Sequence, residues 1–175
     1  MLIAIAGLPG TGKSALARGL AASLGAAVLD KDPIRAALFA PSDIEHSTSQ
    51  DDFCIGIILQ VAGYLWERDP HRAVILDGRP FSKRYQRVEV ARFASNHDVP
   101  FRLIECRCPD HMALERIERD AQAGAHPAGN RDASLYLALK ATFEPFDEPH
   151  LVVDTAVDYH ACLRQCLQYI RDNRS

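Results

Sequence analysis

The chain has 175 residues, 47% of them hydrophobic and 25% charged, and its 20 basic and 23 acidic residues leave a formal net charge of −3. This length predicts one domain with a core large enough to fold without disulfides or a structural metal. The charge balance argues against a strongly basic nucleic-acid-binding protein. Five cysteines, an odd number, are not typical of a secreted disulfide framework, and no stretch approaches the ~20 apolar residues of a membrane helix. We therefore expect a cytoplasmic protein without membrane contact.

Short apolar runs alternate with longer helix-like stretches along the chain. The apolar runs predict strands over 2–6, 27–29, 73–76, 101–106 and 151–153. Helices are predicted over 13–24, 33–39, 51–67, 83–95, 110–121, 134–142 and 159–171. Such alternation is typical of βαβ units, which build a parallel sheet buried on both faces. Because no linker or repeat interrupts it, the sequence predicts a single α/β domain over residues 1–175.

The first predicted strand runs into a glycine-rich segment and then into a helix. The segment matches the pattern G-x-x-x-x-G-K-[ST] in the strand–loop–helix context that a phosphate-binding loop requires. Glycines let backbone N–H groups approach a phosphate closely, and the helix adds its positive N-terminal end. We expect Lys13 to reach the β- and γ-phosphates of ATP, and Ser14 to place its hydroxyl on Mg²⁺. The predicted nucleotide-binding residues are Gly7, Leu8, Pro9, Gly10, Thr11, Gly12, Lys13, Ser14 and Ala15.

A carboxylate follows the third predicted strand. Asp77 would project from the same edge of a parallel sheet as the glycine-rich loop. This is the position of a Walker-B acid, which would hold Mg²⁺ through water or position the attacking group. The alternative is an ordinary turn, since Asp77 is followed by Gly78.

The second predicted strand is followed by two more carboxylates, Asp30 and Asp32, which we expect on the acceptor side of the site. If the acceptor is an alcohol, a carboxylate must orient it and accept its proton, and we assign this role to Asp32. Its alternative role is to cap a helix that begins at Pro33. Arg35 lies one turn further and could bind an anionic group of the acceptor, or it could face solvent.

Phosphoryl transfer also needs positive charge that reaches the transferring oxygens when the site closes, and arginines on a lid commonly supply it. Arg116 and Arg119 are neighbours on one helix face, and Arg131 lies near the end of the irregular stretch 121–132. We expect a lid over about residues 116–132 that carries these catalytic arginines. Alternatively, Arg116 and Arg119 form a solvated, ion-paired helix face.

With the glycine-rich loop, Asp32-x-x-Arg35, Asp77-Gly78 and the arginine-bearing lid in this order, the chain resembles small P-loop kinases of the AAA-type predicted-kinase family over nearly its whole length. Polynucleotide 5′-hydroxyl kinases, chloramphenicol phosphotransferase and zeta-toxin-like kinases belong to this group. The resemblance implies a three-layer P-loop NTPase fold with a five-stranded parallel sheet in the order 2-3-1-4-5 and a helical lid. In polynucleotide kinases, the Asp of Asp-x-x-Arg is the base and the Arg holds an acceptor phosphate.

The chain also resembles, more distantly, the shikimate kinases, whose Asp-x-Asp motif falls on Asp30 and Asp32. Their acceptor-binding Gly-Gly-Gly is absent, because this chain has Asp77-Gly78-Arg79 at that place. Shikimate is therefore not expected as the acceptor. We expect Asp30, Asp32, Arg35, Asp77 and Arg79 to contact the acceptor.

Together, these patterns predict an ATP- and Mg²⁺-dependent kinase that phosphorylates the hydroxyl of a small-molecule acceptor. A polynucleotide 5′-hydroxyl kinase is the first alternative, favoured by Asp-x-x-Arg and opposed by the net charge of −3. A regulatory ATPase without an acceptor is the second. The chain has no Asn-Lys-x-Asp guanine-binding motif, which argues against a GTPase. Its cysteines are expected to be reduced, partly buried thiols. Whether the protein is a monomer or a homodimer is left open.

Overall fold

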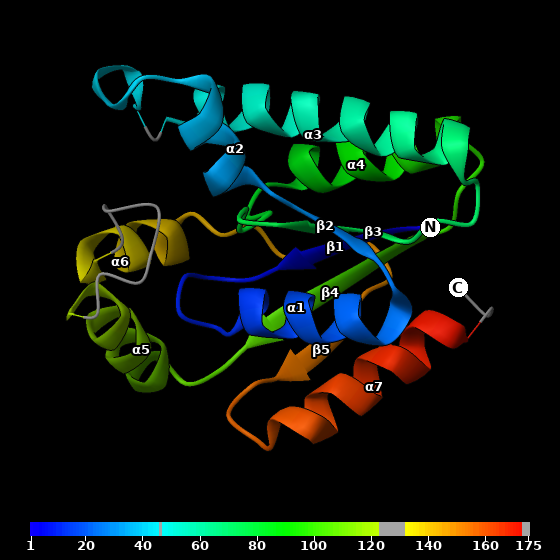
Figure 1. Ribbon diagram of the computed structural model, residues 1–175. Helices are drawn as coiled ribbons and strands as arrows, with labels where there is room; N and C mark the ends of the chain where they lie inside the picture. Colours follow the sequence, from blue (N-terminus) through cyan, green and yellow to red (C-terminus); the bar gives the residue numbers. More distant parts are fainter. Residues whose placement is uncertain (46, 123–131, 173–175) are drawn as a thin grey trace.

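The computed structural model describes residues 1–45, 47–122 and 132–172. Five parallel strands form one sheet in the order β2-β3-β1-β4-β5 (Figure 1). The strands are β1 (Leu2–Ala6), β2 (Ala27–Asp30), β3 (Val74–Asp77), β4 (Phe101–Arg107) and β5 (Leu151–Asp154). This strand order confirms the expected three-layer P-loop fold.

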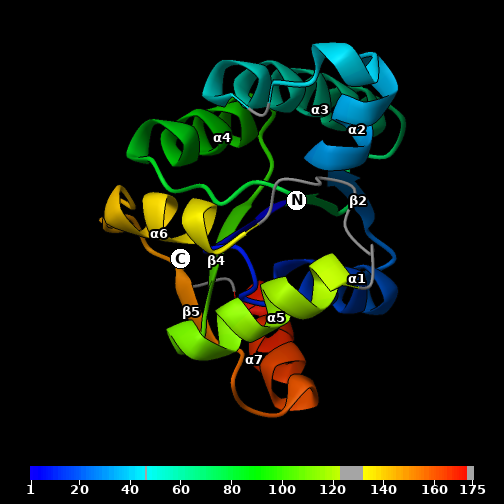
Figure 2. The same ribbon diagram turned by 90° about the vertical axis from the view of Figure 1, so that its left-hand side faces the viewer.

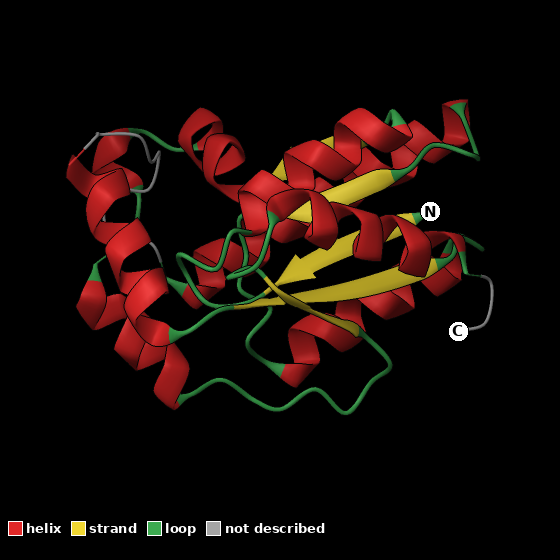
Figure 3. Ribbon diagram, turned by 90° about the horizontal axis from the view of Figure 1, so that it is seen from below, coloured by secondary structure: helices red, strands yellow, loops and turns green. Residues whose placement is uncertain are grey.

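Helices cover both faces of the sheet. The helices are α1 (Lys13–Leu24), α2 (Lys31–Leu38), α3 (Thr48–Arg68), α4 (Arg84–Asn96), α5 (Asp110–Gln122), α6 (Ala133–Ala141) and α7 (Tyr159–Arg171). Figure 3 shows the sheet from the side that α1 and α7 cover, and α3 and α4 cover the opposite face. In Figure 2 the carboxyl ends of the strands face the viewer, and α5 and α6 lie in front of the sheet. These two helices therefore stand where the loops of the site emerge.

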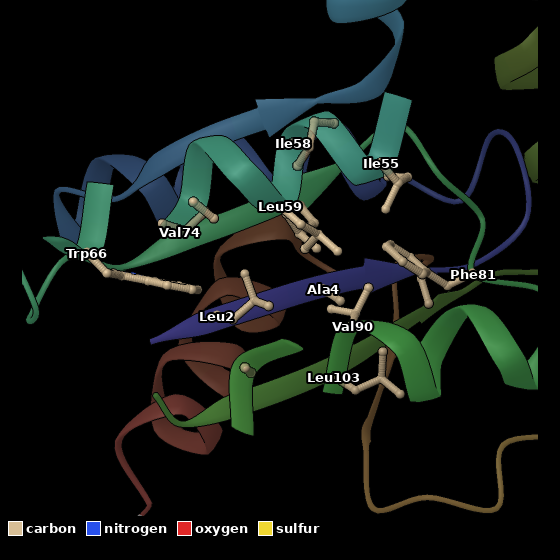
Figure 4. Close-up of a cluster of buried hydrophobic side chains, with 14 residues drawn as sticks. Leu2, Ala4, Ile55, Ile58, Leu59, Trp66, Val74, Phe81, Val90 and Leu103 are labelled. Carbon is tan, nitrogen blue, oxygen red and sulfur yellow. The ribbon is translucent and has the colours of Figure 1, made fainter. Parts of the chain in front are cut away.

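The two layers of core meet the sheet on alternate residues of its strands. On the central strand β1, Leu2 and Ala4 face the cluster under α3 and α4, and Ile3 and Ile5 face the cluster under α1 and α7. Figure 4 shows Leu2 and Ala4 among the side chains of α3, α4 and the neighbouring strands. A strand covered on both faces needs apolar residues throughout, because neither side meets water. This explains why the strands read as continuous apolar runs.

Helix α2 begins two residues earlier than the sequence predicted. The Asp30 side chain accepts a hydrogen bond from the backbone N–H of Asp32 at 3.0 Å, so Asp30 is the N-cap. The expectation that Asp32 caps a helix beginning at Pro33 is therefore wrong. Pro33 still fits, since the first helical N–H groups have no partner within the helix. Asp32 stands in the first turn, where it is available to the site.

The structure also refines the two irregular stretches. A short 3₁₀ helix, η1 (Pro41–Asp43), precedes α3, and α5 continues to Gln122. Asp132 caps α6 by accepting from the N–H of Leu135 at 2.8 Å. Most of the expected lid loop, residues 123–131, lies outside the described residues. Among the residues that are described, no helix is long and apolar enough to cross a membrane.

Candidate active site

The glycine-rich loop between β1 and α1 is closed in by neighbouring backbone. Gly7, Gly10 and Gly12 have φ angles of 133°, 74° and 81°, which residues other than glycine rarely adopt. A Cβ atom at Gly10 would overlap the carbonyl oxygen of Ala113 on α5, and one at Gly7 would overlap that of Cys106 on β4. The loop thus needs glycine both for its backbone angles and for its close packing.

Side chains from the loop hold its curled shape. The Thr11 hydroxyl and the Lys13 ammonium each donate to the carbonyl oxygen of Leu8, at 2.7 Å in both cases. The backbone N–H of Gly7 donates to the carbonyl of Pro80 at 3.0 Å, which ties the loop to the segment after β3. Lys13 is only 5% exposed, so its charge lies inside the loop rather than in bulk solvent.

The close packing at Gly10 leads to a direct prediction. We expect Gly10→Ala to weaken the binding of the ATP analogue AMPPNP by about 100-fold, since the loop must shift to admit the methyl group. Isothermal titration calorimetry measures this. Gly56→Ala is the matched control, because a Cβ there meets nothing within 4 Å and the change should leave affinity intact. Normal affinity in Gly10→Ala would contradict the observed fit of the loop.

A pocket of about 720 Å³ extends from the loop along α1. It is lined by Gly10, Gly12, Lys13, Ser14, Ala15, Leu16, Arg18, Asp30, Arg116, Arg119, Asp120, Thr155, Val157, Tyr159 and Cys162. This larger pocket contains most of the predicted nucleotide-binding residues and two of the three predicted lid arginines. Arg131, the third, lies outside the described residues.

Arg116 connects the loop to the chain after β5. Its guanidinium donates to the carbonyl oxygens of Gly10 at 3.3 Å and Thr155 at 2.9 Å, and to the Thr155 hydroxyl at 3.3 Å. The Thr155 hydroxyl in turn donates to the carbonyl of Thr11 at 2.9 Å. In this state Arg116 braces the wall of the larger pocket, rather than forming the solvated helix face that was the alternative.

A second cavity, of about 230 Å³, lies on the other side of the loop. It is lined by Pro9, Lys13, Lys31, Asp32, Arg35, Thr48, Asp51, Gly78, Arg79, Pro80, Ser82, Gln86, Leu135 and Leu139. Three of the residues expected to contact the acceptor, Asp32, Arg35 and Arg79, come together here. Lys13 lines both cavities. We call the smaller one the acceptor cavity.

Four charged side chains form a network in the wall of the acceptor cavity. The Lys31 ammonium lies 3.1 Å from Asp32 and 2.8 Å from Asp51, and Arg35 pairs with Asp32 at 3.2 Å and also with Asp51. Arg35 is 2% exposed, so the alternative of a solvent-facing arginine is wrong. Lys31 and Asp51 were not predicted as site residues from the sequence. No local signal reveals Asp51, because it belongs to the first turn of α3, distant along the chain.

Comparison with known proteins places the chain in a family. A model of the AAA domain matches residues 2–146. The chain belongs to the AAA domain family. No curated protein sequence matches it.

Among solved structures, this AAA domain is similar to Mycobacterium tuberculosis APS kinase in complex with AMPPNP and APS, with a TM-score of 0.71 and 18% identity over 98% of this chain and 97% of that one. It is similar to Chaetomium thermophilum Kti12 in complex with ADP-AlF3, with a TM-score of 0.71 and 20% identity over 100% of both chains. A gluconokinase from Sinorhizobium meliloti 1021 has a TM-score of 0.65 and 17% identity over 95% of this chain and 89% of that one. These likenesses show the fold, which is that of small P-loop kinases.

Two predicted site residues of this AAA domain lie apart from the acceptor cavity. Asp30 lines the larger pocket, and its carboxylate caps α2. Asp77, 2% exposed at the end of β3, stands beside Asp30 in the register of the sheet. Its Oδ1 atom has no hydrogen-bond partner among the described residues. The structure therefore brings these two carboxylates together at the ends of neighbouring strands. Asp30 lines the larger pocket, and Asp77 lines neither of the two cavities.

The cysteines of the AAA domain are largely sequestered. None is in a disulfide, and four are buried while Cys108 is partly exposed. Burial raises the pKa of the Cys106 and Cys166 thiols to about 12, and it also raises the pKa of Cys162. Within the described residues, no three His, Cys, Asp or Glu side chains gather as metal ligands.

This burial predicts the thiol reactivity of the folded protein. At about pH 8 we expect one thiol per chain, Cys108, to react rapidly with a disulfide reagent, because the other four thiols are buried and closed to the reagent. The remaining thiols should react after denaturation. Absorbance of the released thiolate measures both phases, and Cys108→Ser should remove the fast one. Several fast thiols in the folded protein would contradict this arrangement.

Proposed function

We propose that this protein is an ATP-dependent kinase that transfers the γ-phosphate of ATP to a hydroxyl group of a small-molecule acceptor. The observation that carries the proposal is that Lys13 lines both the larger pocket and the acceptor cavity. A P-loop lysine reaches the β- and γ-phosphates of a bound nucleotide. A nucleotide in the larger pocket would therefore present its γ-phosphate where the acceptor cavity begins.

The residues of the acceptor cavity suit the chemistry of this transfer. The acceptor hydroxyl needs a group that orients it and accepts its proton, and the Asp32 carboxylate is positioned by Lys31 and Arg35. Lys13 and the N-terminus of α1 would stabilise the charge on the transferred group. We propose Arg116, Arg119 and Arg131 as lid arginines. Arg119 lines the larger pocket, as Arg116 does, but no contact between Arg119 and the glycine-rich loop is recorded among the described residues.

Oxygen donors in the larger pocket, and beside Asp30 in its wall, fit Mg²⁺, which prefers hard oxygen donors and keeps several waters. Ser14 lines the pocket, and Asp77 carries a buried oxygen without a partner among the described residues. We propose that Ser14 and Asp77 hold the ion. Bound there with the nucleotide, Mg²⁺ would neutralise charge on the phosphates.

The size of the acceptor cavity, about 230 Å³, supports a small molecule over a polynucleotide. Leu135 and Leu139 of α6 form one of its walls. The APS kinase structure, whose complex includes AMPPNP and APS, and the gluconokinase are fold relatives that also support this choice. We further propose that the protein works in the cytoplasm as a monomer or homodimer.

The test supplies the purified protein with Mg²⁺, γ-labelled ATP and a panel of acceptors. The panel contains sugars, polyols, hydroxy acids, hydroxylated antibiotics and a 5′-hydroxyl oligonucleotide, and Asp32→Asn is assayed in parallel. We expect label on a small molecule that is lost in the variant. Label on the oligonucleotide would instead identify a polynucleotide kinase. ATP hydrolysis that needs no acceptor and is unaffected by Asp32→Asn would identify a regulatory ATPase.

A further inference from the structure

Arg79 is a buried cation in the wall of the acceptor cavity whose donors are only partly used. It follows β3 directly after Gly78, and its side chain is 1% exposed. One terminal nitrogen, Nη2, pairs with Asp52 on α3. Its Nε and Nη1 atoms have no hydrogen-bond partner among the described residues. Buried polar groups almost always have partners, so these donors require an explanation.

Another buried arginine of this chain shows the contrast. Arg87 on α4 is as deeply buried, but it donates to the carbonyl oxygens of Phe81 and Pro145 and pairs with Glu148. Its guanidinium is satisfied by the fold itself, as expected of an arginine with a structural role. The guanidinium of Arg79 is not satisfied by the described residues, and Arg79 lines a cavity that a ligand could enter.

The geometry of a guanidinium group indicates which kind of ligand would accept hydrogen bonds from its unpartnered nitrogens. Its N–H donors form a planar fork that matches two oxygens of a carboxylate, phosphate or sulfate group. The other arginine of the cavity, Arg35, already engages the carboxylates of Asp32 and Asp51. The lining of the cavity holds four cationic side chains against two carboxylates, so it keeps a positive charge even though Lys31 and Arg35 are paired. Arg79 therefore lines the cavity with two guanidinium nitrogens that the described residues leave without a partner.

We propose that Arg79 binds an oxyanionic group of the acceptor, so that the substrate is a small hydroxylated carboxylate or a phosphate or sulfate ester. This inference rests on the proposed kinase function and specifies its substrate class. It transfers to Arg79 the anion-binding role that the sequence analysis gave to Arg35. Arg35 instead positions Asp32 beside the acceptor hydroxyl.

The test measures binding rather than turnover. The protein is saturated with Mg²⁺ and AMPPNP, which occupies the phosphate-binding loop, and is titrated with glycerol, glycerate and glycerol 3-phosphate in a calorimeter. These three-carbon probes differ in one substituent: neutral, carboxylate or phosphate. We expect at least one anion to bind about tenfold or more tightly than glycerol, as charge-assisted hydrogen bonds imply. The tighter anion identifies which oxyanion the cavity accepts.

Two variants and one control separate this role from a structural one. Arg79→Gln should bind the anions no better than glycerol, while Arg92→Gln, an exposed arginine on α4 outside both cavities, should bind like the wild type. Asp52→Asn removes the carboxylate that competes for Arg79, so it should strengthen anion binding by about threefold or more. This gain keeps the test decisive if Arg79→Gln does not fold.

Equal binding of the three probes, no anion binding at all, or an anion preference that persists in folded Arg79→Gln would overturn the inference. A failure of the proposed function looks different. Anion binding that depends on Arg79, combined with no transfer to any hydroxyl acceptor, would retain the anion site and reject the kinase.

Discussion

Replacing Lys13 with methionine should abolish phosphoryl transfer, with kcat/KM falling by at least ~10³-fold. Methionine keeps the unbranched stem but removes the charge that would stabilise the transferred phosphoryl group. Among the described residues that line the two cavities, Lys13 is the one that both share. Transfer of label from γ-labelled ATP measures the loss, and circular dichroism confirms that the variant is folded.

Lys31→Met is the matched comparison for this experiment. Both lysines are buried, but Lys31 lines only the acceptor cavity, where it contacts Asp32 and Asp51. We expect Lys31→Met to retain AMPPNP affinity and to raise mainly the KM of the acceptor. If Lys13→Met turned over nearly normally, the glycine-rich loop would not be the phosphate-binding element of this protein.

Changing Asp32 to asparagine should lower kcat by about 10²-fold or more while AMPPNP affinity stays within about threefold. Asparagine preserves the shape of the side chain but cannot accept the acceptor proton. Asp32 lines the acceptor cavity and is absent from the wall of the larger pocket, so nucleotide binding should not depend on it. Steady-state transfer and calorimetric binding separate the two quantities.

Asp51→Asn tests whether the effect belongs to the base or to the charge network. Asp51 pairs with Lys31 and Arg35, the same two cations as Asp32. Losing it should disturb the network, with kcat reduced less than about tenfold. Equal losses of kcat in the two variants would show that the network as a whole matters. A collapse of AMPPNP affinity in Asp32→Asn would assign Asp32 to metal binding or to structure.

Much of the fold and of the nucleotide side of the site follows from local sequence patterns. The bounds of β1, α1 and α7 were predicted to the residue, and the sheet order followed from the family resemblance. Continuous apolar runs identify strands that are buried on both faces, and the glycine-rich loop combines its turn, its lysine and its helix start within eight consecutive residues, 7–14. Such features depend on residues close together in the chain.

The acceptor side depended on the tertiary structure. Lys31 meets Asp51 across 20 residues, and Arg79 meets Asp52 across 27, because α3 packs its first turn beside α2 and the segment after β3. The sequence alone does not indicate whether a charged side chain faces water or pairs with another charged side chain. Whether Arg35 was exposed or buried, and which arginine kept donors for a ligand, was decided by how these elements pack, since burial and pairing are set by residues that only folding brings together.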